Sequence, residues 1–255
     1  MKRLRDFTTA RVALGRAGNS IATPELLEFQ LAHARARDAV HQAMDAFSLA
    51  SEIRAKGMEC EIAASAAPDR ATYLRRPDLG RTLAAESRER IAQLAGDYDL
   101  VFVIADGLSA LAVHSHAVNM LIAATLPGWL IAPVIVVQQG RVAIGDEIGQ
   151  LLGARLAVML IGERPGLSSP DSLGIYVTWN PHPGVTDAQR NCLSNIRSGG
   201  IAYEAAARNL IYLLTESRRR KLTGVMLKEA AGYGSTQIPA PSNEDASAKL
   251  TVKLD

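Results

Sequence analysis

The stretch that decides the fold is LAVMLIGERPGLSSPDSLGIYVTWNPHPGVTDAQRNCLSNI, residues 156–196. It opens on an unbroken apolar run, 156–161, which changes abruptly into the glycine-rich and charged turn 162–166. A second apolar run, 175–179, then leads to a segment that carries Cys192. Short apolar runs rich in β-branched residues are typical of strands buried on both faces of a sheet. The stretch therefore predicts a strand, a loop, a second strand and a second loop.

Two further apolar runs lie upstream, at residues 99–105 and 133–138. The segment between them, residues 110–126, has the composition of a helix, and another helix is predicted to open at residues 146–149. Strands that alternate with helical crossovers of this length are typical of parallel sheets. We therefore predict an α/β fold with a Rossmann-like, mostly parallel sheet flanked by helices.

The chain divides into three predicted regions. Residues 1–66 form an N-terminal, mainly helical region, in which Thr23, Pro24 and Glu25 begin an amphipathic helix that runs to about residue 46. Residues 67–228 form the Rossmann-like domain, with a helix from Pro77 to residue 96 and an amphipathic helix at 203–219. In residues 229–255 small and polar residues accumulate and periodicity fades, which predicts a flexible tail.

Composition narrows the class of protein. The chain has 255 residues, of which 48% are hydrophobic and 21% charged, so it can bury a core. Two cysteines are too few for a disulfide framework, which favours a reducing, cytoplasmic location. The net charge of +2 gives no reason to expect nucleic acid or a membrane surface as partner, and prolines and glycines interrupt the longest apolar stretch.

Signatures of the commoner catalytic classes are absent from the sequence. It contains no GxGxxG after a strand, no GxxxxGK[ST], no HExxH and no GxSxG. The histidines His114 and His116 are two residues apart, so on a helix they face different directions and do not form a metal-binding pair. We therefore predict no metal ligands on this chain.

Three polar residues follow predicted strands. Asp106 follows the run 99–105, where ligands of open α/β sheets bind. Glu163 lies in the turn 162–166, where it could accept hydrogen bonds from a ligand or pair with Arg164 or Arg141. Cys192 could be a nucleophile or a small packed side chain. No histidine is arranged to activate the thiol, which favours the packed side chain.

A fourth candidate is an arginine cluster at the predicted entrance of the helix that starts at Pro77. Arg75, Arg76 and Arg81 surround this turn. Guanidinium groups bind phosphate and carboxylate oxygens in bidentate fashion. The cluster is either an anion-binding site or a solvated helix entrance.

Several long motifs, in the same order, match one known family. These motifs are ARVALGRAG, YLRRPDLGR, VIADGLSA, GRVAIGDEIGQLLGA, LIGERPGL and RNCLSNI, and together they span about residues 8–228. Over that range the sequence resembles the small (light) subunit of ethanolamine ammonia-lyase. The resemblance implies a subunit of an adenosylcobalamin-dependent lyase that converts ethanolamine to acetaldehyde and ammonia.

The same resemblance implies how the work is divided. A large subunit of the hetero-oligomer binds ethanolamine, while the small subunit covers the cobalamin at the interface and supplies no catalytic residue. The family's cofactor contacts carry over to Val142, Glu163 and Cys192. No chemical argument selects Val142, which enters through the family match. A DxHxxG motif is absent, so the resemblance implies a cofactor that keeps its own base as the lower ligand.

Position in the predicted fold agrees with this assignment. Val142 and Glu163 follow predicted strands that we expect to be neighbours, so both can reach one ligand, and Cys192 can reach the same edge from the loop after the fourth strand. Two alternatives stay open. One is a stand-alone Rossmann-like enzyme that uses Glu163 or Asp106 as general base. The other is a non-catalytic scaffold protein.

The sequence leaves two expected locations inside the cell. Some members of the resembled family carry a longer N-terminal extension implicated in packaging into a bacterial microcompartment. This chain begins close to the first matching motif. Both the free cytoplasm and the microcompartment are therefore kept as expected locations.

Overall fold

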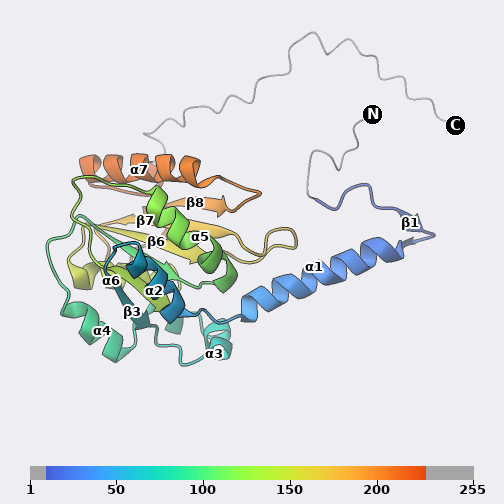
Figure 1. The fold of residues 1–255 in the computed structure, drawn as a ribbon, viewed down its shortest axis with the longest axis horizontal. Coiled ribbons are helices and arrows are strands. Elements are labelled where there is room, and N and C mark those ends of the chain that lie inside the picture. The colour runs from blue at the N-terminus through green and yellow to red at the C-terminus, as the bar shows by residue number, and fades with distance from the viewer. Residues whose placement is uncertain (1–9, 228–255) are drawn as a thin grey trace, which may run out of the picture.

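The protein is an α/β structure built around one mixed sheet, as seen in a computed structural model that describes residues 10–227 (Figure 1). The predicted tail, residues 229–255, lies outside the described residues. Within residues 10–227 the sheet has six strands, in the order β3 (Cys60–Ala64), β5 (Val134–Gln138), β4 (Leu100–Ala105), β6 (Leu156–Gly162), β7 (Leu173–Trp179) and β8 (Arg190–Ile196). Strands β3, β5, β4 and β6 run parallel, which confirms the predicted fold class.

Helices cover both faces of this sheet. The helices are α1 (Thr23–His41), α2 (Ala46–Ala55), α3 (Arg70–Arg75), α4 (Ala85–Ala92), α5 (Ala110–Ala123), α6 (Ile144–Leu152) and α7 (Tyr203–Arg220). Short strands β1 (Arg16–Ala17) and β2 (Ser20–Ile21) precede them, and the 3-10 turns are η2 (Leu79–Arg81) and η3 (Asp187–Gln189). None of the helices within residues 10–227 has the length and apolar character needed to span a lipid bilayer.

Alternating side chains of the central strand divide the core into two layers. Leu100, Phe102 and Ile104 of β4 pack with α2, α5 and α7 on one face. Val101 and Val103 point the other way and pack with α4 and α6. Successive side chains of a strand point to opposite faces, so an unbroken apolar run is what a doubly covered strand requires.

The residues before position 66 contribute to the same sheet. Strand β3 pairs with β5 along its whole length, from Cys60 opposite Val134 to Ala64 opposite Gln138. Helix α2 lies on β3 and buries Leu49 in the core. Residues 46–64 therefore share one core with the Rossmann-like part of the chain.

The end of the sheet differs from the prediction in two ways. Strand β7 runs antiparallel to β6, and residues 190–196, expected as a loop around Cys192, form β8 beside β7. In β8 buried and exposed residues do not alternate regularly, so hydrophobic periodicity could not reveal this strand. A third expectation was also wrong: β4 lies between β5 and β6, so Val142 and Glu163 do not follow neighbouring strands.

The helix expected from Pro77 to residue 96 is shorter than predicted. It is reduced to η2, an extended segment and α4, because residues 82–84 bond to the rest of the fold. Ala84 N–H donates to the carbonyl of Ala64, and Leu83 N–H donates to the Glu147 carboxylate. Tertiary hydrogen bonds thus outweigh the local helical preference.

Helix α1 extends away from the sheet (Figure 1). We expected it to bury one apolar face within the chain, and that expectation was wrong. Among its described side chains only Ala39 is buried, whereas Leu27 is 59% exposed. The middle of α1 lines a shallow pocket together with the loop residues Leu167 and Pro170, yet most of its apolar side chains contact solvent in the isolated chain.

A buried ion pair closes the carboxyl ends of β4 and β5. The Arg70 guanidinium at the start of α3 lies 2.7 Å from the Asp106 carboxylate, which also accepts a hydrogen bond from Gly140 N–H. Burial raises the pKa of Asp106 to about 6, and the positive charge of Arg70 opposes that rise. The Tyr73 hydroxyl lies within 3.0 Å of the carbonyl oxygens of Gly107 and Gly140. Helix α3 is therefore tied to both strand ends.

This geometry predicts the effect of removing one hydroxyl. Tyr73→Phe leaves two buried carbonyl groups without their donor, which should lower the free energy of unfolding by about 1–3 kcal/mol. Tyr98→Phe is the matched control, because the half-buried Tyr98 hydroxyl makes one long contact of 3.3 Å to Leu94. Urea unfolding of both variants measures the difference. Equal losses for the two would contradict the assigned role of Tyr73.

Candidate functional site

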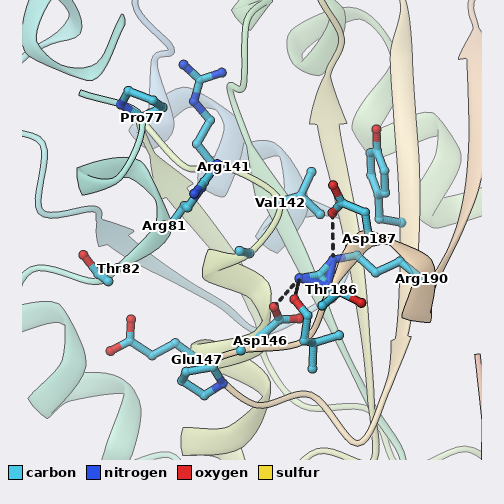
Figure 2. Close-up of a pocket in the computed structure, with 15 residues that line it drawn as sticks. Pro77, Arg81, Thr82, Arg141, Val142, Asp146, Glu147, Thr186, Asp187 and Arg190 are labelled. Atoms are coloured by element: carbon cyan, nitrogen blue, oxygen red, sulfur yellow. Dashed lines mark hydrogen bonds and ion pairs between the residues drawn. The ribbon is translucent and has the colours of Figure 1, made fainter. Parts of the chain in front are cut away.

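A pocket of about 810 Å³ lies beside the sheet, between the segment that follows β5 and the segment that leads into β8 (Figure 2). Arg141 and Val142 line it from the end of β5, and Tyr176 lines it from β7. Arg190 enters from β8 and Arg81 from η2. The volume falls in the range of about 300–1,000 Å³ that is usual for ligand sites.

A buried ion pair lies at one side of this pocket. The Arg190 guanidinium is 2.6 Å from the Asp146 carboxylate, and both side chains are only 2% exposed. Arg190 also donates to the carbonyl of Val185, and its Nε lies 3.8 Å from the exposed carboxylate of Asp187. Figure 2 shows the guanidinium reaching toward both carboxylates. Its Nε and Nη1 atoms are buried without a hydrogen-bond partner among the described residues.

Val142 is partly buried and lines the pocket wall. It packs against the core layer that contains the α6 side chains. Tyr176 packs against the same layer. The two side chains therefore give the pocket an apolar surface next to its charged groups.

Glu163 is held by three donors at the end of β6. Its carboxylate accepts hydrogen bonds from the hydroxyls of Ser172 and Ser194 at 2.5 Å each, and from Asn195 N–H at 3.2 Å. No ion pair joins it to Arg164 or Arg141 within the part of the chain that the structure describes. Glu163 thus fastens the end of β8 to the end of β6.

Cys192 is an exposed residue of β8 that pairs with Tyr176 across the β7–β8 ladder. Desolvation by surrounding atoms and the Glu163 carboxylate raise the pKa of the thiol, while the interaction with Tyr176 lowers it. A raised pKa keeps the sulfur protonated, and the thiolate is the nucleophilic form. The arrangement therefore favours a contact residue over a nucleophile.

The candidate residues are connected through Tyr176, which sequence reasoning missed. Tyr176 lines the pocket with Val142 and lies opposite Cys192, and the charge of Glu163 acts on Tyr176 and Cys192 alike. The signal available in the sequence was a tyrosine inside an apolar strand, where Thr178 supplies a second hydroxyl. Arg190 was missed too, because nothing local indicates that its guanidinium is buried.

The remaining candidates have structural partners. Asp106 is enclosed by Arg70 and does not line the pocket, so it is poorly placed to act as a general base. The His114 ring accepts a hydrogen bond from Asp45 N–H, and His116 lies 2.6 Å from the Tyr203 hydroxyl. Over residues 10–227, no group of three or more His, Cys, Asp or Glu side chains could hold a metal ion.

Comparison with known proteins identifies the family. The profile of the family described as "Ethanolamine ammonia-lyase light chain (EutC)" matches residues 1–228. The chain belongs to this ethanolamine ammonia-lyase light-chain family. The pocket, Glu163 and β8 all fall within the matched range, as do the motifs that carried the resemblance, which is thereby confirmed.

Curated relatives agree with this family assignment. A protein named "Ethanolamine ammonia-lyase small subunit" from Pseudomonas putida strain F1 is 53% identical over 254 residues, covering 96% of this chain and 92% of the relative. One of the same name from Xanthomonas campestris pv. campestris strain B100 is 56% identical over 254 residues, covering 94% and 93%. The similarity thus extends over nearly the whole length of both chains.

The buried pair at the pocket predicts a pH dependence of stability. Burial raises the pKa of Asp146 from 3.8 to about 6, against the lowering effect of Arg190. The native protein therefore binds this proton more tightly than the unfolded chain does. The resulting stabilisation is fully present below pH 3.8 and is lost as the pH rises through about 6.

The variant Asp146→Asn, which cannot ionise, serves as the reference. Between pH 4 and pH 7 the stability of the wild type relative to this variant should fall by up to about 3 kcal/mol. Urea unfolding at each pH measures the difference. Asp38→Asn, at an exposed carboxylate of α1 that does not line the pocket, is the control and should show little change. A wild-type advantage that grows with pH would contradict the raised pKa.

Proposed function

We propose that this chain is the small subunit of an adenosylcobalamin-dependent ethanolamine ammonia-lyase, which converts ethanolamine to acetaldehyde and ammonia. In this proposal its pocket face covers part of the cobalamin at the interface with a large subunit that binds the substrate. One observation carries the proposal: the motif residues, far apart in sequence, lie around Tyr176. Val142 lines the pocket with Tyr176, Cys192 lies opposite Tyr176 across β7 and β8, and the Glu163 charge acts on Tyr176, although neither Cys192 nor Glu163 lines the pocket itself. The chain belongs to the ethanolamine ammonia-lyase light-chain family, and this membership is the reason to interpret the arrangement as a cofactor contact.

The residues of the pocket fit a cobalamin. A corrin ring is broad, has an apolar face and carries many peripheral amides, so it needs apolar contact and scattered hydrogen-bond partners. Val142 and Tyr176 offer apolar surface. The orphaned N–H groups of Arg141 and Arg190 offer buried donors, which are costly to leave unsatisfied. A ligand rich in carbonyl oxygens would satisfy such donors.

This chain has a binding role in the proposal and no role in proton transfer. Adenosylcobalamin, when bound, supplies the radical chemistry, and the protein supplies orientation and the exclusion of water. Glu163 positions Ser194 and Asn195, and this holds the neighbouring Cys192 at the exposed edge of the sheet. Val142 provides apolar surface on the pocket wall.

Helix α1 supports the existence of a large partner surface. Its exposed apolar side chains include Leu26, Leu27, Phe29 and Leu31. Contiguous exposed apolar surface marks interaction sites, and permanent subunit interfaces resemble a protein core divided between two chains. Relatives carry the name small subunit, which agrees with a partner of this kind.

Reconstitution tests the proposal directly. The chain purified together with the large subunit should retain adenosylcobalamin through gel filtration, detected by corrinoid absorbance, and should form acetaldehyde only when ethanolamine is added. The isolated chain is the control and should be inactive. Activity of the isolated chain would favour the stand-alone enzyme, and loss of that activity in Glu163→Gln with unchanged stability would identify Glu163 as its base. No corrinoid retained with any of several large subunits would refute the proposal and favour a scaffold protein.

A charge on the pocket wall tests whether the cofactor contacts this face. Val142→Asp should raise the Kd of the complex for adenosylcobalamin by about 10-fold or more, because a carboxylate would be desolvated against the ligand. Val225→Asp is the matched control, since Val225 is 53% exposed and does not line the pocket. Absorbance titration measures both, and thermal unfolding checks that each variant is folded. Equal affinities for the two variants would place the cofactor elsewhere.

A further inference from the structure

Two arginines of the pocket differ from their neighbours in having no carboxylate partner. Arg76 pairs with Asp78, Arg88 pairs with Glu147, and Arg190 pairs with Asp146. Arg81 and Arg141 also line the pocket region, yet within residues 10–227 neither forms an ion pair. Two guanidinium charges are therefore left uncompensated by neighbouring carboxylates.

These two arginines sit on adjacent stretches of backbone. Arg141 N–H donates a 2.7 Å hydrogen bond to the carbonyl of Gly80, the residue before Arg81. The approach is close enough that a Cβ added at Gly80 would lie 2.9 Å from Arg141 Cγ. Figure 2 places both arginines near Pro77, away from the Arg190–Asp146 pair. One ligand group can therefore contact both side chains.

Arg141 is also held in a defined orientation. Its guanidinium carbon lies 4.3 Å from the centre of the Tyr73 ring, and Tyr73 is itself fully buried and hydrogen-bonded. A guanidinium stacked on an aromatic face loses less freedom when it binds. The Nε atom of Arg141 is buried without a partner among the described residues. A buried charged donor of this kind requires an acceptor, and no protein atom in the described chain provides it.

The acidic groups of the pocket do not cancel these charges. The Glu147 carboxylate is 2.6 Å from Arg88 and accepts a hydrogen bond from Leu83 N–H. Asp146 is occupied by Arg190, and the exposed Asp187 lies on the Arg190 side of the pocket. The part of the wall around Arg81 and Arg141 is therefore positively charged.

The chemistry of this subsite selects an anion. Planar guanidinium groups bind phosphate oxygens in bidentate fashion, and two of them match a singly charged phosphodiester. Cobalamin carries one phosphodiester, in the arm that joins the corrin ring to its nucleotide base. Resting on the proposed function, we infer that Arg81 and Arg141 bind the phosphodiester of the cobalamin nucleotide arm. In that arrangement Arg81 and Arg141 would hold the phosphodiester on the η2 side of the pocket, and Val142 would contact another part of the cofactor.

The test compares two corrinoids in the complex with the large subunit. Adenosylcobalamin contains the phosphodiester and the nucleotide, and adenosylcobinamide lacks both. Arg81→Gln and Arg141→Gln should each raise the Kd for adenosylcobalamin by about 10- to 100-fold, and leave the Kd for adenosylcobinamide within about twofold. Absorbance titration measures binding without reference to activity.

Controls separate this subsite from a general loss of structure. Arg75→Gln is the matched control, because Arg75 lies nearby but does not line the pocket and bonds to the carbonyl of Ala71. It should change neither Kd. Arg81 is exposed, so its variant folds even if replacement of the stacked Arg141 lowers stability. Arg141→Lys keeps the charge and should recover part of the affinity for adenosylcobalamin.

Each other outcome overturns the inference. Unchanged adenosylcobalamin affinity in both glutamine variants removes the arginines from the cofactor site while the proposed function stands. An equal loss for both corrinoids shows that the arginines do not recognise the phosphodiester. Binding of inorganic phosphate that weakens in the variants, with no change toward either corrinoid, assigns the subsite to a free phosphate. Failure of the wild-type complex to bind either corrinoid refutes the proposed function itself.

Discussion

The buried Arg70–Asp106 ion pair is the interaction on which the layout of the site depends. Ligands of open α/β sheets usually bind beyond the carboxyl ends of the strands. Here Asp106 draws Arg70 and α3 over the ends of β4 and β5, and Tyr73 bonds to both strand ends beneath it. That space is filled by protein, so the open pocket lies to one side, between Val142 and Arg190. Because leaving one of these buried charges without its partner costs free energy, the ion pair should hold α3 stably over the ends of β4 and β5.

The antiparallel strands β7 and β8 build the other wall. Their addition to a parallel sheet brings Tyr176 and Arg190 onto the face where α6 lies, and Asp146 neutralises the buried arginine there. Glu163 fixes the far end of β8 through Ser194 and Asn195. Its role in the isolated chain is thus to hold a strand in register, and this is compatible with a ligand contact at the rim. In the proposed function, the Glu163 carboxylate both holds β8 in place and contacts the ligand.

A division of labour among arginines follows from their partners. Arg70 and Arg190 are buried and paired, so their charges stabilise the arrangement of elements. Arg81 and Arg141 are without carboxylate partners in the described chain, and Arg141 is oriented by the Tyr73 ring. Tyr73 therefore joins the structural lock at the strand ends to the charged wall of the pocket. Substitution of Tyr73 would therefore affect both the hydrogen bonds at the strand ends and the orientation of Arg141 in the pocket wall.

The sequence by itself determined the fold class and the family. Unbroken apolar runs such as residues 99–105 require burial on both faces, and long ordered motifs carry the light-chain resemblance, because both signals are local. Only the tertiary structure decided that β7 is antiparallel, that residues 190–196 form a strand, and that α1 leaves its apolar side chains exposed. The pocket is likewise lined by residues from 77 to 190, and whether an arginine there has a carboxylate partner depends on contacts between distant segments. The spacing of apolar residues along a sequence predicts which residues are buried, but it does not predict which residues of distant segments they contact.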